Sequence, residues 1–260
     1  MLSPLYGQLS PLRVPTSMRF IPNDADVLAY VLAVEAADGQ QLESGVISAY
    51  ESFITGCKSD SIWSAIKASC IMAGARTLPG ALVPLVGTAP TNNNFVSGDY
   101  DRAGLLGNAT TKRLNTNRHS TADPQNNMHM SVYLKTIAGI YHLAATEISA
   151  NGVSQLLDSR VRNRSVSING SVVGLTAPQF LGATRNSSEN FTHRRFATNT
   201  TYATASQTSV NSNYFVFSGS ATTSRSSSRI AFYSIGESLD LALLNARVST
   251  LMTDLAAAIS

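Results

Sequence analysis

The chain has 260 residues, of which 43% are hydrophobic and only 13% charged, with a formal net charge of +3. Globular proteins carry about 25% charged residues, so the charged fraction of this chain is low. Intrinsic disorder is excluded, because a disordered chain is strongly charged and poor in apolar residues. The near balance of 19 Lys and Arg against 16 Asp and Glu gives no large positive field, so no nucleic-acid partner is expected.

Residues 1–22 are predicted to form an extended docking arm. They contain four prolines, which neither continue a helix nor donate to a strand ladder. The leucines and the tyrosine of the arm favour docking on its own domain or on a neighbouring subunit. The arm has no basic start followed by a long apolar run, so no secretory signal is predicted. No stretch approaches the roughly 20 apolar residues of a membrane span, so no membrane insertion is expected.

Residues 23–76 are predicted to form a small helical bundle. Val27, Tyr30, Val31 and Val34 recur at helical spacing between a capping Asn23 or Asp24 and Gly39. A second apolar face ends at Gly56, and a third helix is expected from about residue 60 to residue 74. Cys57 and Cys70 lie 13 positions apart without metal-ligand spacing and are predicted to be buried free thiols.

Residues 77–97 indicate a linker or cover strand, and residues 98–235 an antiparallel β-sandwich or jelly roll. Short alternating runs separated by Gly, Asn and Ser are typical of strands in such folds. The expected strands are Leu114–Asn117, Met128–Thr136, Ile140–Thr146, Val166–Ile168, Phe180–Ala183, Phe191–Thr198, Tyr214–Ser218 and Ile230–Ser234. The predicted fold class is therefore α+β.

Residues 236–260 are predicted to form a C-terminal helix. Its apolar residues follow a heptad spacing over about two repeats. This seam is expected either to dock on the N-terminal bundle or to mediate self-association, and it consists of Leu241, Leu244, Val248, Leu251 and Leu255.

The search for chemistry yields no catalytic residue and no cofactor, so the protein is expected not to be an enzyme. Asp99 and Asp101 are a weak candidate pair for a metal ion, although two acids in a turn are commonly turn formers. Ser238 lies in a Gly-Glu-Ser-Leu segment but has no downstream histidine to activate it. A glycosidase would need two carboxylates across a cleft, drawn from Asp99, Asp101, Asp123 and Glu147.

Arginines are concentrated between residues 160 and 229, where eight of them accompany the single acid Glu189. Guanidinium groups recognise carboxylate and phosphate in bidentate fashion, so contact with an anionic glycan or an acidic neighbour is one interpretation. A solvated set of strand-edge charges is the other. The candidate ligand-binding residues, with two aromatic residues of the same region, are Arg160, Arg162, Arg164, Arg194, Arg195, Tyr202 and Tyr214.

Residues 104–134, GLLGNATTKRLNTNRHSTADPQNNMHMSVYL, resemble the strand–turn–strand that opens concanavalin-like (laminin-G-like) sandwich domains of tailed-phage appendage proteins. In these domains a Gly-Leu-x-Gly-Asn-Gly-Thr-Thr-Lys block precedes Asn-Arg and a DPQN-x-x-H strand. Residues 61–91 and 230–252 are similar to the helical segments that flank the domain. Ala109 stands where the pattern usually has glycine, and no catalytic residue is implied.

The resemblance implies a structural component of a tailed-phage virion, in the tail, its fibres or the baseplate, made in the bacterial cytoplasm without secretion. Other virion proteins and a second copy of the chain are the expected partners. The Asn-, Ser- and Thr-rich sandwich is expected to bind host-surface carbohydrate through weak, repeated contacts. The alternatives are a capsid decoration or assembly protein without a ligand and a capsule-degrading glycosidase.

Overall fold

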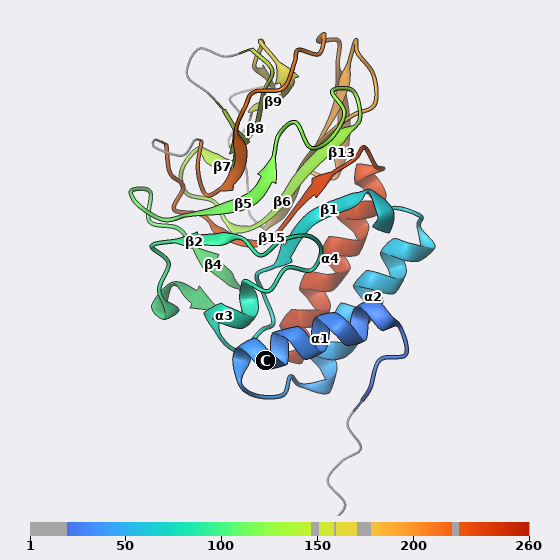
Figure 1. The fold of residues 1–260 in the computed structure, drawn as a ribbon, viewed down its shortest axis with the longest axis vertical. Coiled ribbons are helices and arrows are strands. Elements are labelled where there is room, and N and C mark those ends of the chain that lie inside the picture. The colour runs from blue at the N-terminus through green and yellow to red at the C-terminus, as the bar shows by residue number, and fades with distance from the viewer. Residues whose placement is uncertain (1–19, 147–150, 159, 171–177, 220–223, 260) are drawn as a thin grey trace, which may run out of the picture.

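The computed structural model describes residues 20–146, 151–158, 160–170, 178–219 and 224–259. Two antiparallel β-sheets form a sandwich, and α-helices from both ends of the chain gather at one end of the molecule (Figure 1). The predicted α+β class, with an antiparallel sandwich and a C-terminal helix, is confirmed. No helix in the described ranges is both long enough and apolar enough to cross a membrane.

The helices and strands follow in chain order. The helices are α1 (Ala25–Asp38), α2 (Ser44–Ser59), α3 (Leu78–Ala81) and α4 (Leu241–Ala258), with 3₁₀ turns at Trp63–Ala65 and Ser97–Asp99. The strands are β1 (Ile66–Ile71), β2 (Thr91–Asn93), β3 (Tyr100–Asp101), β4 (Gly104–Leu106), β5 (Arg113–His119), β6 (Met128–Thr136), β7 (Tyr141–Ala145), β8 (Val153–Leu157), β9 (Arg160–Ser165), β10 (Asn169–Gly170), β11 (Gln179–Arg185), β12 (Phe191–Arg195), β13 (Thr198–Tyr202), β14 (Asn213–Val216) and β15 (Arg229–Gly236).

The first sheet, here called sheet A, has the strand order β13-β12-β11-β6-β15-β4-β3, and β1 pairs with β15 beside this path. The second, sheet B, has the order β10-β9-β8-β7-β14-β5-β2. Register places Phe232, Tyr133 and Phe180 side by side across β15, β6 and β11. Because side chains alternate along a strand, their neighbours Tyr233, Val132 and Leu181 point into the space between the sheets.

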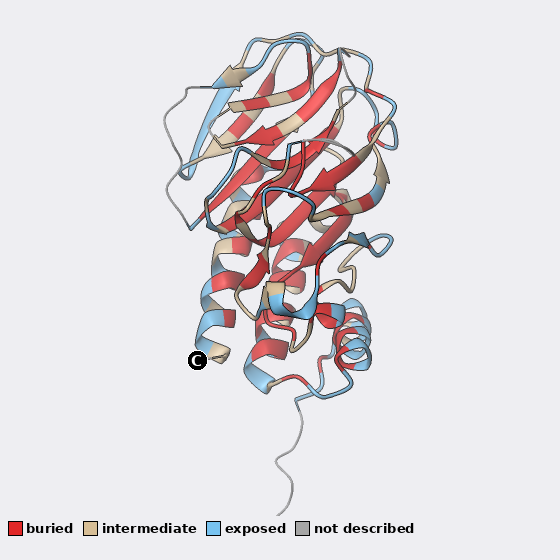
Figure 2. Cartoon of the chain, turned by 90° about the vertical axis from the view of Figure 1, so that its left-hand side faces the viewer, coloured by how far each residue is buried: buried red, intermediate tan, exposed pale blue. Residues whose placement is uncertain are grey.

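The helices form a third layer on the outer face of sheet A and share one core with it. That core contains the buried residues of α1, α2 and α4 together with Tyr133, Phe180 and Phe232. Buried residues therefore occupy both faces of sheet A. Figure 2 shows long stretches of its strands in the red of buried residues. The heptad seam of α4 belongs to this core, since each of its five residues is at most 2% exposed. The seam is therefore covered within the chain and offers no surface for self-association.

The prediction of a third helix, from about residue 60 to residue 74, is wrong. Residues 63–65 form a 3₁₀ turn, and residues 66–71 form β1, which pairs with β15. Ile66 and Ile71 face the helical core, whereas Ala68 and Cys70 face the core between the sheets. A strand buried on both faces shows no alternation of apolar and polar residues, so its pattern resembles that of a buried helix. Both Cys57 and Cys70 are buried and free.

Other sequence predictions need local correction. Residues 77–97, predicted as a linker or cover strand, contain the short helix α3 as well as strand β2. Residues 191–198 turn back on themselves as β12 and β13 instead of forming one strand. Residues 166–168 lie in a bend, while β8 and β9 were not predicted. The five-segment domain division stays a prediction, with β1 lying inside the range assigned to the helical bundle.

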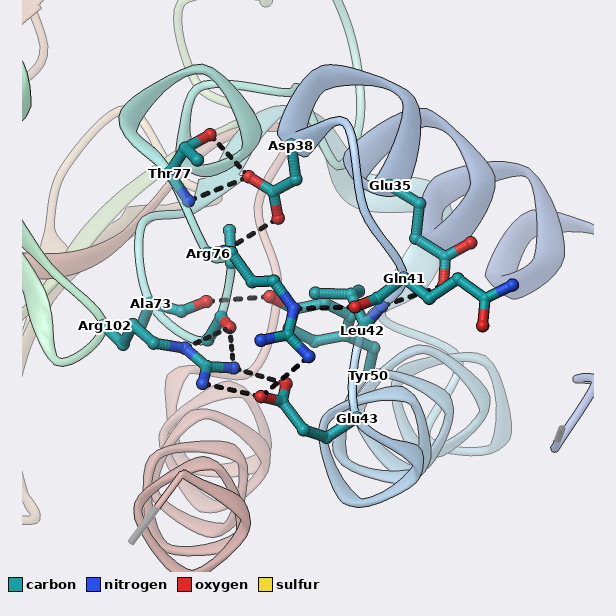
Figure 3. Close-up of polar contacts among 12 residues, drawn as sticks. Glu35, Asp38, Gln41, Leu42, Glu43, Tyr50, Ala73, Arg76, Thr77 and Arg102 are labelled. Carbon is teal, nitrogen blue, oxygen red and sulfur yellow. Dashed lines mark hydrogen bonds and ion pairs between the residues drawn. The ribbon is translucent and has the colours of Figure 1, made fainter. Parts of the chain in front are cut away.

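A polar network fixes the helical layer to the loops of the sandwich (Figure 3). The Asp38 carboxylate accepts hydrogen bonds from the backbone N–H groups of Arg76 and Thr77 at 2.7 and 2.8 Å. Arg102 donates to both carboxylate oxygens of Glu43 at 2.8 and 2.6 Å and also to the Gly74 carbonyl. This pair lowers the pKa of Glu43 and raises that of Arg102. The helices are thus held in one orientation.

The turn between β4 and β5 explains why glycine is usual at position 109. Ala109 has a φ of 61°, in the left-handed region that costs a residue with a Cβ atom about 1 kcal/mol. Asn108 Oδ1 holds the turn by accepting from the N–H groups of Thr110, Thr111 and Lys112 at 3.1, 2.9 and 3.0 Å.

Ala109→Gly is therefore expected to stabilise the protein by about 0.5–1 kcal/mol, because glycine adopts this conformation without strain. Chemical denaturation of the two proteins measures the difference. Ala89→Gly, in an exposed segment of ordinary backbone, is the control and is expected to give no gain. Equal or lower stability of the position-109 variant would contradict the account of this turn.

Candidate functional site

A cleft lies between α4 and the hairpin formed by β12 and β13, and we call it the α4–hairpin cleft. It consists of two hollows on the outer face of sheet A. The first, about 380 Å³, is polar and is lined by Thr184, Asn186, Thr192, Asn199, Ser238, Leu239, Asp240 and Leu241. The second, about 270 Å³, is partly aromatic and is lined by Tyr133, Pro178, Gln179, Phe180, Phe196, Ala197, Asn245 and Ser249.

The hairpin turn presents an aromatic side chain at the edge of the cleft. Arg195 pairs with Thr198, so Phe196 and Ala197 form a two-residue turn, and both have positive φ angles of 49° and 54°. Such a turn matches the twist of its strands but ordinarily uses Asn or Gly. Phe196 remains 43% exposed, with the Arg195 guanidinium 5.1 Å from the centre of its ring. The turn thus holds a phenyl face beside the aromatic hollow.

Arg194 lies between the two hollows and connects the hairpin to α4. Its Nη1 donates to Asn199 Oδ1 at 2.9 Å, and Asn199 lines the polar hollow. With its amide oxygen turned toward the guanidinium, Asn245 of the aromatic hollow accepts from Nε and Nη2 at 3.1 and 3.2 Å. Desolvation lowers the pKa of Arg194, and Asp240 opposes that shift. The guanidinium therefore fixes amides in both hollows.

The polar hollow offers hydroxyl, amide and carboxylate groups at fixed positions. Asp240 caps α4, since its Oδ1 accepts from the N–H groups of Ala242 and Leu243 at 2.6 and 3.3 Å. The Thr184 hydroxyl accepts from Leu239 N at 3.3 Å. Thr192 and Asn199 stand on the paired strands β12 and β13. Such groups, next to an aromatic face, suit a small polyhydroxylated ligand, which needs an apolar surface and a few convergent hydrogen-bonding groups.

Of the arginines predicted to bind a ligand, Arg194 is the one that contacts residues lining the cleft, Asn199 and Asn245. Arg160 and Arg162 lie on β9 of sheet B, where the inward-facing Val161 between them places both on the outer face of that sheet. They are on the opposite side of the sandwich from the cleft. The predicted set therefore does not form one site.

Of the remaining predicted residues, Arg164 and Tyr214 are closed to a ligand by burial, and Tyr202 is half-buried. Arg164 and Tyr214 are fully buried. Tyr202 packs its ring 5.5 Å from that of Phe191 and 6.4 Å from that of His193, against the core between the sheets. None of the three lines the α4–hairpin cleft.

Arg164 and Arg185 instead bind main-chain carbonyl groups inside the fold. Arg164 Nη2 donates to the carbonyls of Ser120 and Asp123 at 2.8 and 3.0 Å. Arg185, also fully buried, donates to the carbonyls of Asn163, Ser187, Asn190 and Thr204 at 2.8 to 3.1 Å. Burial, with Arg164 as a lesser cause, lowers the pKa of Arg185 to about 10. These two arginines hold loops together.

The predicted acidic residues are also engaged elsewhere. Asp99 binds Lys112 and the Val96 N–H, and Asp101 binds Arg229 and the Ala103 N–H, so all four carboxylate oxygens have partners. Asp123 is 4% exposed and forms an ion pair with Arg118. Glu147 lies outside the described residues. Within the described part of the chain, no group of three His, Cys, Asp or Glu residues is placed to hold a metal ion.

One serine–histidine pair, not predicted from the sequence, has the geometry of a nucleophile and its base. His129 Nδ1 lies 2.5 Å from the Glu237 carbonyl and must donate to it, so Nε2 accepts from the Ser234 hydroxyl at 2.7 Å. Burial lowers the pKa of His129 to about 4, which keeps the ring neutral. Ser234 and His129 are both fully buried, so the pair satisfies polar groups within the fold and is closed to substrate.

Comparisons with known proteins give structural likeness only. No family model matches the chain, and no curated protein sequence is significantly similar to it. It is similar to domain 4 of a GH43 extracellular arabinanase from Geobacillus stearothermophilus (10% identity, TM-score 0.40, 62% of this chain and 82% of that chain). It is similar to the enzymatically active domain of tailspike protein 2 of bacteriophage CBA120 (14%, 0.38, 59% and 28%). It is also similar to the binding domain of botulinum neurotoxin serotype D (13%, 0.45, 72% and 51%).

With identities and TM-scores this low, the likenesses assign no activity or ligand to the chain. The expectation that the protein is not an enzyme is not retained, because two of these three similar structures are parts of enzymes. That expectation came from the lack of a recognisable motif, and a catalytic group assembled from distant strands leaves no motif in the sequence.

Proposed function

We propose that this protein is a structural component of a tailed-phage virion, located in the tail, that binds host-surface carbohydrate in the α4–hairpin cleft. The observation that carries the binding half is the cleft itself. An exposed phenyl face, Phe196, adjoins amides held by Arg194, and a hollow lined by hydroxyl and carboxylate groups lies next to them. A pyranose ring needs this combination, because one of its faces is apolar and its edge is covered with hydroxyl groups.

The virion half of the proposal is supported by the sequence. Residues 104–134 and the flanking segments resemble tailed-phage appendage proteins, and the glycine of that pattern falls at Ala109, which has positive φ. The partners would be other virion proteins and further copies of this chain. The α4 seam cannot be the contact between copies, because it is buried within the chain. Repetition of one weak site in a particle would give firm attachment.

Phe196→Ala is expected to weaken glycan binding about tenfold, which corresponds to roughly 1.4 kcal/mol for the loss of one aromatic anchor. The full chain is first screened on an array of bacterial surface glycans, and affinity for the strongest ligand is then measured by calorimetry. Val96→Ala is the matched control, since Val96 is 62% exposed and lies outside the cleft. Its affinity is expected to equal that of the unaltered protein.

The same material distinguishes the alternatives. Retention of no glycan would contradict the binding half and favour a decoration or assembly protein, and immunogold labelling of virions would then show whether the head carries it. Release of reducing sugar from a bound polysaccharide would favour the capsule-degrading glycosidase. Equal losses in Phe196→Ala and Val96→Ala would place the binding site outside the α4–hairpin cleft.

A further inference from the structure

Helix α1 is apolar on the face that it turns to solvent as well as on the face that it buries. Val27, Val31 and Val34 are fully buried in the helical core. The solvent side carries a second helical stripe at spacing i, i+3, i+4 and i+7, formed by the exposed residues Ala29, Leu32, Ala33 and Ala36. A surface helix ordinarily has charged or polar residues there, and a helix that is apolar all round is ordinarily covered.

A groove runs beside this stripe. Its volume is about 340 Å³, and its lining residues are Asp26, Ala29, Tyr30, Ala33, Trp63, Pro84, Leu85 and Val86. Trp63 is only partly buried, and the Lys58 ammonium lies 5.8 Å from the centre of its ring. Lys58 also forms an ion pair with Asp26, whose side chain is 56% exposed. The groove is therefore an apolar trough with one ionised residue, Asp26, in its lining.

We infer that residues 1–19 of the same chain bind in this groove and cover the outer face of α1. The segment joins the described chain at Phe20, five residues before α1 begins at Ala25. An extended segment of this length spans up to about 60 Å, whereas the 14 residues of α1 extend over about 21 Å. The segment can therefore reverse direction and follow the whole helix.

The composition of residues 1–19 complements the groove. Apolar side chains recur at Leu2, Leu5, Leu9 and Leu12, and the prolines disfavour a helix. Its charged side chains, Arg13 and Arg19, are both basic, which suits the exposed carboxylate of Asp26. Phe20 and Ile21 continue the apolar character and are 39% and 64% exposed. Attachment to the same chain gives the segment a high effective concentration, so weak contacts suffice.

Trp63 reports on this contact directly, because it is the only tryptophan of the chain. Removal of residues 1–19 is expected to shift its emission to longer wavelength and to increase its quenching by acrylamide, while circular dichroism stays unchanged. A synthetic peptide of residues 1–19 added in excess is expected to reverse both effects. Unchanged emission and quenching in the shortened chain would overturn the inference.

Point variants of the full chain separate binding from loss of fold. The double variant Leu5→Asp/Leu9→Asp is expected to reproduce the shortened chain, whereas Ser3→Asp/Ser10→Asp adds the same charge to the same segment and is expected to leave Trp63 protected. Ala33→Glu, at an exposed position of the groove, is expected to expose Trp63 from the other side. Protection that disappears on dilution, together with a falling mass in light scattering, would overturn binding within one chain and assign the groove to a second copy.

Discussion

The protein is expected to lose most of its stability between pH 6.5 and pH 4, because three histidines are buried without charge. Burial lowers the pKa of His129 and of His193 to about 4, and that of His142 to about 3, from an ordinary value of 6.5. For His193 the nearby Arg195 adds to the effect of burial. The folded chain therefore keeps these rings neutral down to about pH 4.

The direction of the effect follows from proton linkage. Below pH 6.5 the unfolded chain binds protons at these rings and the folded chain does not, so acid favours unfolding. The stability is fully present above pH 6.5 and is lost as the pH falls toward the folded-state values. Each histidine contributes roughly 3 kcal/mol over this interval, and three of them compare with the whole stability of a domain, about 5–15 kcal/mol.

Urea unfolding at half-unit intervals between pH 8 and pH 4.5 measures this dependence. The free energy of unfolding is expected to fall with a slope approaching three protons, about 4 kcal/mol per pH unit. His142→Gln, which removes one titrating ring, is expected to reduce that slope by about one third. Carboxylates such as Asp24 and Glu43, whose pKa values are lowered by their basic partners Lys58 and Arg102, change the free energy of unfolding only at lower pH. A flat profile down to pH 5 would show that the rings titrate as in the unfolded chain.

Arg185→Met is expected to destabilise the protein by about 3–5 kcal/mol, because it leaves buried carbonyl groups without donors. Asn163, Ser187, Asn190 and Thr204 would each lose a hydrogen bond from the guanidinium. Methionine keeps the length of the side chain, so the loss reflects the polar contacts. Arg185→Lys is expected to recover only part of the lost stability, since an ammonium group cannot reproduce the planar set of donors.

Arg160→Met is the matched control for this experiment. It makes the same replacement in the same arginine-rich segment, at a half-buried position on the outer face of sheet B. Chemical denaturation is expected to show a change within about 0.5 kcal/mol. Similar losses in the two variants would contradict the assignment of Arg185 as the residue that holds these loops.

The sequence by itself determined the elements whose periodicity has one buried face. The helix from residue 24 to Gly39 and the C-terminal helix were predicted close to their observed bounds, and Met128–Thr136 coincides with β6. In each helix a capping aspartate, Asp24 or Asp240, marks the start. The resemblance of residues 104–134 places a glycine at position 109, and Ala109 has the positive φ that glycine adopts most easily.

Only the tertiary structure decided which charged residues are accessible. The sequence does not distinguish the four arginines at positions 160, 164, 185 and 194. Arg164 and Arg185 are buried against carbonyl groups. Arg194 borders the α4–hairpin cleft, whereas Arg160 lies on the opposite face of the sandwich. A single residue's type does not reveal whether distant carbonyls converge on it. The pairing of β11, β6 and β15 and the packing of the helices fix that.

The cleft itself was beyond the reach of the sequence for the same reason. Arg194 and Asn199 come from a hairpin, Tyr133 from a central strand and Asn245 from the last helix, so no motif joins them. β1 was mistaken for a helix because both of its faces are buried. The periodicity of a sequence reveals one buried face of a helix or strand. A strand that lies between two cores, or a site formed by three elements, is defined only when the layers pack together.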